Sequence, residues 1–391
     1  MLFTVDFKPI THRKMVTFAQ ILFKFVTIIK NNSGKVRNFA VMKFFRKILL
    51  PFFMLICMVD CHAIGIELDT IASWGKFPKF CIDVYRWGDK TFNSYDSTYV
   101  VGTGYKFKVI ERNESWIDYY KFQFEDDHQM EMISDPCTSM GLHVSYLALS
   151  AGYDINVSKF FGGSEKARKR FDFGFSCSLI AANFYFISND VGTEIKWYDK
   201  DRNKLFGPYS FDGINCSSWG LETYYFFNHN KYSQAAAFSY SKIQKKSAGS
   251  FFAGISYRQD DYNFDFSGEP EHIKALIPSS WENYSYKRLN RNYAFKLGYG
   301  YNFVFPHNWT LGLNISPIVG LRRGSIGDVE LSKNALSFNN RINIGSAYNH
   351  KAWFVGLYGT WDLGFIKEKD HTFTTMMMSF TASVGFRFNL W

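Results

Sequence analysis

The last twenty residues, TFTTMMMSFTASVGFRFNLW (372–391), alternate between two kinds of side chain. Every second residue from Met376 to Leu390 is apolar, while most of those between them are small or polar. Because successive side chains of a strand point to opposite faces, this pattern predicts one strand with an apolar and a polar face. Strands of globular proteins usually have about five or six residues. The fold must therefore provide a long apolar environment on one side of this strand.

The same alternation recurs upstream and predicts further strands. A weaker pair of segments, 98–110 and 115–124, brings the expected number to about twelve. The ten clear strands are expected at 139–153, 170–187, 216–228, 231–242, 249–266, 291–305, 308–323, 338–349, 351–366 and 372–390.

Two architectures explain long alternating strands. A soluble secreted β-sandwich buries one face against a second sheet, whereas a membrane barrel turns that face to lipid. A membrane-spanning strand needs about 9–11 residues, and most of these segments reach that length. The polar parity holds glycines such as Gly298 and Gly312 beside Arg322 and Arg387, which is typical of a lumen. We therefore predict an all-β fold, an antiparallel up-and-down transmembrane β-barrel of about 12 strands.

Loop lengths indicate the orientation, because outer-membrane barrels have short periplasmic turns and longer external loops. The linkers near Pro306 and Asn349 are short and are expected to be periplasmic. The longer connections 155–169, 267–290 and 324–337 are then external. One segment, 188–215, falls on the periplasmic side in this scheme and is too long for it. We expect it to hold an extra hairpin within GTEIKWYDKDRNKLFGPYSF.

The N-terminal region resembles an export signal. From Met42 the chain reads MKFFRKILLPFFMLICMVDCHAIG, a basic start, a short apolar run and a small residue before Ile64. This layout is typical of a secretory signal peptide, with cleavage expected after Ala63. Residues 1–41 are interpreted as an upstream extension absent from the mature protein, and the alternative is a cytoplasmic tail ahead of a membrane anchor. The expected domains are 1–41, signal peptide 42–63, a periplasmic segment 64–94 and the barrel 95–391.

Charge excludes a nucleic-acid partner. The chain has a formal net charge of +10, but residues 1–63 hold ten Lys or Arg and two acids. The remainder carries 35 basic and 33 acidic residues, a net charge of +2, so the basic character belongs to the leader. Four cysteines lie beyond Ala63 without the spacing of a zinc site, and Cys177 is interpreted as a free buried thiol, with the pairing of the others left open. They are Cys81, Cys137, Cys177 and Cys216.

Three stretches also resemble a known family. They are STYVVGTGYKFKVIERN (Ser97–Asn113), YYFFNHNKYSQAAAFSYSKIQKKSAGSFFAGISY (Tyr224–Tyr257) and GYGYNFVFPHNWTLGLNISPIVG (Gly298–Gly320). They are similar to a barrel-like family of Bacteroidetes-type bacteria, domain-of-unknown-function family 4421. The resemblance covers residues 95–391 and implies an outer-membrane β-barrel in a Gram-negative cell envelope. It implies no particular chemistry.

Charged residues on the polar parity form the main candidate site. Inside a narrow barrel such charges must pair, because an unpaired buried charge is costly. We expect a plug of ion pairs, and the alternative is a slightly anion-selective pore. The candidate lumen network consists of Asp172, Glu222, Arg258, Lys296, Arg322, Arg341, Asp362 and Arg387.

A second candidate is the stretch KKSAGS. Lys245, Lys246, Ser247 and Gly249 offer ammonium groups and exposed amides that can contact an anion. The alternative is a tight periplasmic turn whose small residues pack closely, and this alternative is favoured.

The leading interpretation is a non-catalytic barrel with a structural, binding or narrow-pore transport role, and a lipid-modifying barrel enzyme is the alternative. His143 and Ser145 lie two apart on the lumen face of one strand, too far apart for direct proton transfer without a third group. No catalytic, cofactor-binding or metal-binding residue is assigned. Outer-membrane lipid and the barrel-assembly machinery are the expected partners, and a monomer is expected.

Overall fold

The structure, a computed structural model, divides the chain into two units, 1–83 and 84–391. It describes residues 94–124, 128–158, 168–279, 281–326, 329–330, 335–367 and 371–389, with isolated residues 73, 79, 83, 86 and 87. The expected extension, signal peptide and cleavage site lie outside the described residues, as does nearly all of 64–94. Within the described residues, no helix has the length and apolar character needed to cross a bilayer.

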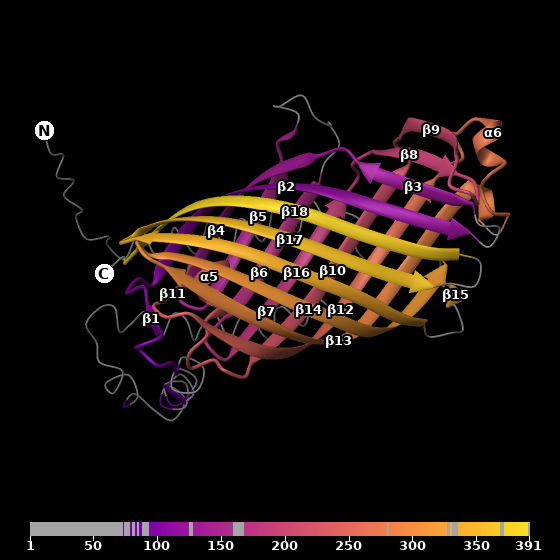
Figure 1. Cartoon of the computed structure of the whole chain (residues 1–391). Coiled ribbons are helices and arrows are strands. Elements are labelled where there is room, and N and C mark those ends of the chain that lie inside the picture. Colours follow the sequence, from indigo (N-terminus) through magenta and orange to yellow (C-terminus); the bar gives the residue numbers. More distant parts are fainter. Residues whose placement is uncertain are drawn as a thin grey trace, which may run out of the picture. The chain divides into compact units, whose positions relative to one another are not determined.

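Twelve of the described strands close into one antiparallel barrel (Figure 1). Each pairs with the next barrel strand along the chain, and the last pairs with the first, from His371 opposite Phe124 to Phe388 opposite Phe107. This confirms the predicted up-and-down β-barrel. The barrel strands are β2 (Phe107–Phe124), β4 (Cys137–Tyr146), β5 (Leu149–Asn156), β6 (Arg168–Ser176), β7 (Ile180–Asn189), β10 (Ile214–Phe226), β12 (Ala248–Asp265), β13 (Ser285–Phe305), β14 (Trp309–Ile326), β16 (Ala335–His350), β17 (Trp353–Lys367) and β18 (His371–Phe388).

The remaining elements lie at the two ends of the barrel. At one end, β3 extends the sheet from the last part of β2, and β8 and β9 follow it. At the other end, β1 and β11 form a separate two-stranded sheet next to a short helix, α5. These elements are β1 (Val100–Gly102), β3 (Gln129–Ser134), β8 (Thr193–Tyr198), β9 (Lys204–Phe211), α5 (Gln234–Phe238), β11 (Lys242–Gln244), α6 (Glu271–Lys274), the 3-10 helix η3 (Glu282–Tyr284) and β15 (Val329–Glu330).

The count of about twelve is confirmed, but five strand assignments are corrected. The expected strands 139–153 and 170–187 are each a hairpin, β4–β5 and β6–β7. The expected pair 98–110 and 115–124 is instead the short β1 followed by one continuous strand, β2. The expected strand 231–242 lies outside the barrel sheet and contains α5.

These corrections also remove the difficulty with 188–215. The short turns after β4, β6, β13 and β16 share one end of the barrel, here called the turn end, with the first residue of β2 and the last of β18. Because β6 and β7 form a hairpin, 188–215 lies at the opposite end, the loop end, together with 155–169, 267–290 and 324–337. The expected hairpin within it is confirmed as β8–β9. All of the longer connections except the one between β10 and β12 therefore lie at the loop end.

An apolar belt covers the outer face of the barrel. Residues directly opposite each other in an antiparallel pair share a face, and exposed apolar side chains occupy the same parity on successive strands. On β13, exposed apolar side chains run from Tyr293 to Phe305, about 40 Å along the strand at 3.3 Å per residue. With the tilt of about 35–45° usual in such barrels, this length covers a hydrocarbon layer. The belt is therefore the surface that the terminal alternation predicts.

Candidate functional site: the charged chamber and its two closures

The centre of the barrel holds a chamber lined by balanced charges. Its volume is about 410 Å³. Five arginines and five carboxylates line it, so the described wall carries no net charge from these residues. They are Arg112, Arg168, Arg170, Arg258, Arg341, Glu114, Asp118, Glu222, Asp260 and Asp362.

One ion-pair network crosses the chamber around Glu222. The Glu222 carboxylate on β10 lies 2.9 Å from Lys296 Nζ on β13 and 2.8 Å from Arg341 Nη1 on β16. Tyr224 donates a hydrogen bond of 2.6 Å to the same carboxylate. Arg341 also contacts Asp362 on β17, with 2.9 Å between Nε and Oδ2. Four of the eight predicted lumen residues are therefore brought together, and they tie four separate strands.

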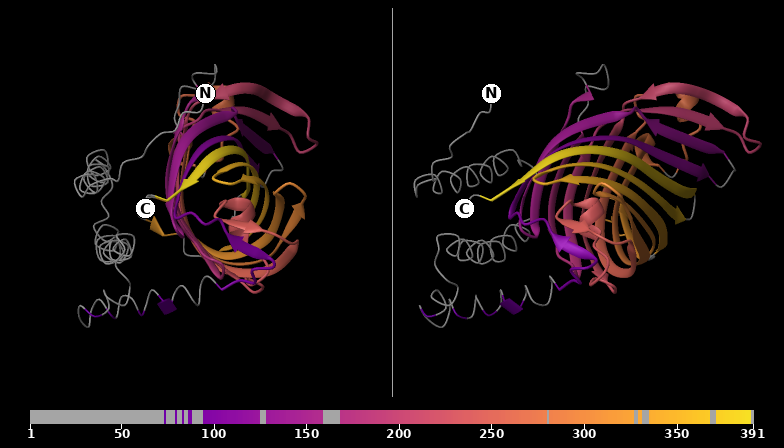
Figure 2. Two further views of the ribbon diagram at one scale, coloured as in Figure 1. Left: turned by 90° about the vertical axis from the view of Figure 1, so that its left-hand side faces the viewer. Right: turned by 60° about the vertical axis from the view of Figure 1, so that its left-hand side comes forward.

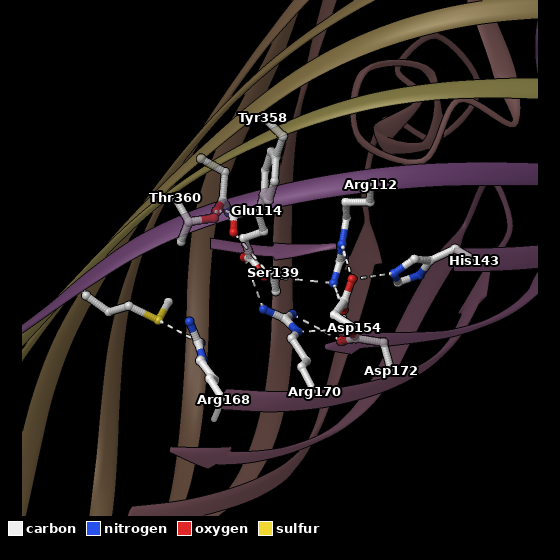
Figure 3. A network of polar contacts seen from close by, with 12 residues as sticks. Arg112, Glu114, Ser139, His143, Asp154, Arg168, Arg170, Asp172, Tyr358 and Thr360 are labelled. Carbon is white, nitrogen blue, oxygen red and sulfur yellow. Dashed lines mark hydrogen bonds and ion pairs between the residues drawn. The ribbon is translucent and has the colours of Figure 1, made fainter. Parts of the chain in front are cut away.

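A second network lies on the wall formed by β2, β4, β5 and β6 (Figure 3). Arg112 forms ion pairs with Asp154 and, at 3.3 Å, with Asp172. Arg170 Nε lies 2.8 Å from Asp172 Oδ2, and Arg170 Nη1 lies 3.4 Å from Glu114. Among these residues, only Asp172 was predicted from the sequence. Arg112 and Glu114 lie between the expected strands 98–110 and 115–124, and Asp154 lies just beyond the expected strand 139–153.

The acids of the second network are poorly suited to hold a metal ion. His143, Asp154 and Asp172 bring possible ligand atoms within 4.8 Å of one another. The His143 ring Nε2 lies 3.2 Å from Asp154 Oδ1. Arg112 contacts both carboxylates, however, and therefore occupies the position from which a cation would bind them. The carboxylates of this wall are thus held by ion pairs with arginines of the chain.

The other predicted lumen residues make contacts elsewhere inside the barrel. Arg258 Nε lies 2.7 Å from Asp260 on its own strand, β12. Arg322 Nη1 donates a hydrogen bond of 3.1 Å to Asn290. Arg387 instead donates to the Tyr240 backbone carbonyl, at 3.0 Å from Nε. All eight predicted residues are buried or half-buried, but the expected single network is several separate groups.

At the turn end the lumen is filled by the connection between β10 and β12, here called the plug (residues 227–247). In the left view of Figure 2, α5 lies inside the ring of strands. Tyr232 donates a hydrogen bond of 2.8 Å to Asn314, and Asn302 Nδ2 donates one of 2.8 Å to the Ser233 carbonyl. Ala236 is fully buried. The two-stranded sheet β1–β11 continues the plug.

Glycines on the inner face of the barrel leave room for the plug. A Cβ at Gly345 would lie 2.9 Å from the Ala237 carbonyl oxygen and 2.8 Å from the Phe238 ring. A Cβ at Gly312 would lie 2.5 Å from Ala237 Cβ. Glycine at these lumen positions therefore allows α5 to pack against the barrel wall, since larger side chains would displace the helix.

The KKSAGS stretch joins the plug to β12. Lys245 N donates a hydrogen bond of 2.7 Å to the Tyr99 carbonyl, and Lys246 Nζ lies 5.3 Å from the centre of the Tyr99 ring. Ser247 Oγ accepts a hydrogen bond of 2.9 Å from Val304 N, and a Cβ at Gly249 would meet the Tyr299 hydroxyl at 2.3 Å. All four candidate anion-contacting residues thus make contacts within the chain. The arrangement favours the alternative interpretation, a closely packed turn.

At the loop end the lumen is crossed by a cluster of buried aromatic side chains, here called the aromatic cap. Its central residues are Phe122, Trp281, Tyr286 and Phe373, with 4.5 Å between the ring centres of Phe122 and Phe373 and 5.0 Å between those of Phe122 and Tyr286. The ring of Tyr120 on β2 lies 5.4 Å from that of Phe264 on β12. Since β2 and β12 are six places apart in a ring of twelve strands, these contacts span the interior.

The structure also shows the positions of the cysteines and of the two residues considered for an enzyme, His143 and Ser145. Cys177 is a buried free thiol, as predicted, and Cys137 and Cys216 are free and buried too, while Cys81 lies outside the described residues. His143 contacts Asp154, and Ser145 is buried at 5% exposure on the same strand. Both side chains face the barrel interior.

Residues 94–388 match the family model described as "Domain of unknown function (DUF4421)". The chain belongs to this family. No curated protein matches the sequence.

Solved structures of other barrels are also similar to this chain. The β domain of the Bordetella autotransporter BrkA has 8% identity and a TM-score of 0.31, covering 71% of this chain and 99% of that chain. The outer membrane protease OmpT from Escherichia coli has 8% identity and a TM-score of 0.34, covering 72% and 97%. The KdgM porin has 9% identity and a TM-score of 0.21, covering 70% and 99%.

Proposed function

We propose that the protein is an outer-membrane barrel with a closed lumen, which has a structural or binding role in the cell envelope. The observation that carries the proposal is the filling of the lumen at both ends, by the plug and by the aromatic cap. The belt supports placement in a membrane, with lipid as the surrounding partner. The alternating β18 supports recognition by the barrel-assembly machinery.

Transport through a narrow pore is the less favoured role. An anion-selective pore needs an excess of cationic groups along its path. The chamber instead has equal numbers of arginines and carboxylates, and ion pairs such as Arg341–Glu222 and Arg170–Glu114 join several of them. Opening a path would also require movement of the plug and of the buried rings around Phe122. These features support a barrel that does not conduct ions.

Conductance in a planar bilayer tests this proposal. The purified, folded protein is expected to insert without producing steady current, at both signs of the applied voltage. An engineered comparison, the protein with residues 233–241 replaced by a glycine-rich turn, is expected to stay closed as well, because the aromatic cap still crosses the lumen. Steady anion-selective current from the unmodified protein would contradict the closed-lumen role.

The absence of a catalytic role is part of the proposal. In lipid-modifying barrels the reacting groups must reach lipid, but His143 lies inside the barrel with its ring against Asp154. The hydroxyl of Ser145 is buried on the same inner face. We therefore expect no phospholipase or acyltransferase activity in the pure protein. Turnover of a phospholipid substrate that disappears in the Ser145→Ala variant would overturn this part.

A further inference from the structure

A carboxylate interrupts the apolar belt on the first barrel strand. Glu111, Asn113 and Ser115 occupy three successive outward positions of β2. Glu111 lies opposite Leu142 on β4 and Val384 on β18, which are 59% and 41% exposed on the outer face. Residues directly opposite each other in an antiparallel pair share a face. The carboxylate of Glu111 therefore faces outward, at the seam between the first and last strands.

The depth of this group places it inside the belt. The margin at the turn end is aromatic, since the rings of Phe107 and Phe388 stack at 5.5 Å and that of Tyr146 lies 4.8 Å from Phe107. Glu111 is four residues further along β2, about 13 Å at 3.3 Å per residue. With a strand tilt of about 40°, it lies about 10 Å into a belt about 25 Å tall. Asn113 is deeper still.

A carboxylate at this depth calls for a partner. Charged groups on the lipid face of a barrel are destabilising near the midplane. Asn113 Nδ2 donates a hydrogen bond of 2.7 Å to Glu111 Oε1, which satisfies only part of the carboxylate. Ser115 Oγ lies 2.9 Å from Thr138 Oγ1 on β4. The described outward positions around this group, such as Met140 and Val384, are apolar.

We propose that this patch, formed by Glu111, Asn113, Ser115 and Thr138, is the contact between two copies of the chain in the membrane. Two copies with the same orientation are related by a two-fold axis along the membrane normal, so equivalent residues lie at the same depth and each contact occurs twice, once in each direction. Such an interface must be self-complementary. The patch satisfies this, because Asn113 has a second amide hydrogen to donate and Glu111 has further oxygen lone pairs to accept it.

The shape of the patch fits the same partner. Ser115, Thr138 and Ala382 are small and lie on the same outer surface. Small side chains let two membrane-embedded backbones approach closely. The larger Met140 and Leu142, with exposed fractions of 46% and 59%, border the patch and provide apolar contact. The inference replaces the monomer expected from the sequence, and it rests on the proposed outer-membrane location.

Cysteine cross-linking in native outer membranes tests this inference. The Ser115→Cys variant, which keeps Glu111 and Asn113, is expected to form a covalent dimer on mild oxidation, because a disulfide requires Cα atoms within about 7 Å. A matched control is Phe295→Cys on β13, an outward position that is 54% exposed and lies away from the seam. The control and the unsubstituted chain are expected to stay monomeric on non-reducing gels. Adding Glu111→Leu to Ser115→Cys is expected to lower the dimer fraction about tenfold.

The other possible results of this experiment contradict either the proposed contact or the outer-membrane location on which it rests. Equal dimer fractions from Ser115→Cys and Phe295→Cys would show random collision, and a cross-linked product of another mass would identify a different partner. Retained dimers after Glu111→Leu would show that the carboxylate has no part in the contact. A barrel that keeps its heat-dependent gel shift but gives no Ser115→Cys dimer would overturn this inference alone. A soluble protein without that shift would overturn the proposed function as well.

Discussion

Replacing Glu222 with leucine is expected to lower the free energy of unfolding by about 3–5 kcal/mol, the cost typical of removing one partner from a buried ion pair. The substitution leaves Lys296 Nζ and Arg341 Nη1 without the carboxylate that lies 2.9 and 2.8 Å from them. Lys296 is 1% exposed and has little access to solvent. Urea titration of the protein folded in lipid vesicles, followed by tryptophan fluorescence, measures the change.

A partly exposed ion pair provides the matched control for this result. Lys121 and Glu131 lie 3.7 Å apart with side chains 18% and 25% exposed. The Glu131→Leu variant is expected to change the free energy of unfolding by about 1 kcal/mol or less. Replacing Glu222 and Lys296 together, by leucine and methionine, is expected to recover part of the loss, because an apolar pair can replace a buried ion pair. Equal effects of Glu222→Leu and Glu131→Leu would contradict the assigned network.

Substituting Gly345 with valine is expected to displace the plug from the lumen. The added Cβ would lie 2.9 Å from the Ala237 carbonyl oxygen, closer than side-chain carbons normally approach backbone. Overpacking of this kind usually costs about 1–3 kcal/mol. The fully buried Ala236, changed to cysteine as a reporter, is expected to react with a water-soluble maleimide at least about tenfold faster once α5 moves.

The neighbouring strand, β17, provides a control glycine. A Cβ at Gly359 on β17 would lie 3.8 Å from its nearest described neighbour, the Ser379 carbonyl oxygen. The Gly359→Val variant is therefore expected to leave maleimide reactivity of the Ala236→Cys reporter unchanged. If Gly345→Val also leaves reactivity unchanged while the barrel stays folded, α5 does not pack against β16 as described.

The last six barrel strands could be predicted from the sequence because their outer faces are almost continuously apolar. On β18, for example, Met378, Phe380 and Val384 are exposed to the outside, while Ser379, Thr381 and Ser383 are buried on the inside. The lumen parity of Lys296, Arg322 and Arg387 follows from the same period of two. Within these six strands, the local sequence alone was sufficient to predict the strand and the face on which each side chain lies.

The first half of the barrel could not be predicted in the same way. On β2 the outward positions Glu111, Asn113 and Ser115 are polar, so the alternation vanishes there and the strand was divided in two. The turn between β6 and β7 contains Cys177, Ser178 and Leu179, with no glycine, proline or asparagine to indicate it. The polar patch that prevented the prediction of β2 as one strand is thus the same patch that is proposed to contact a second copy of the chain.

The pairing of lumen charges also could not be predicted from the sequence. Glu222 and Arg341 are 119 residues apart, and their contact depends on which strands face each other across the closed ring. Parity shows that a side chain enters the lumen, but not which strand lies opposite. The partners Arg112 and Asp154 became visible only with the correct division of β2, β4 and β5.

Membrane fractionation, followed by gels of the detergent extract with and without boiling, shows whether the protein is a folded barrel in the outer membrane. A folded barrel keeps its closed sheet in detergent at room temperature and unfolds only on heating. The protein is expected in the outer-membrane fraction, with a mobility that changes on boiling. A protein found in the soluble periplasmic fraction, with the same mobility before and after boiling, would contradict it.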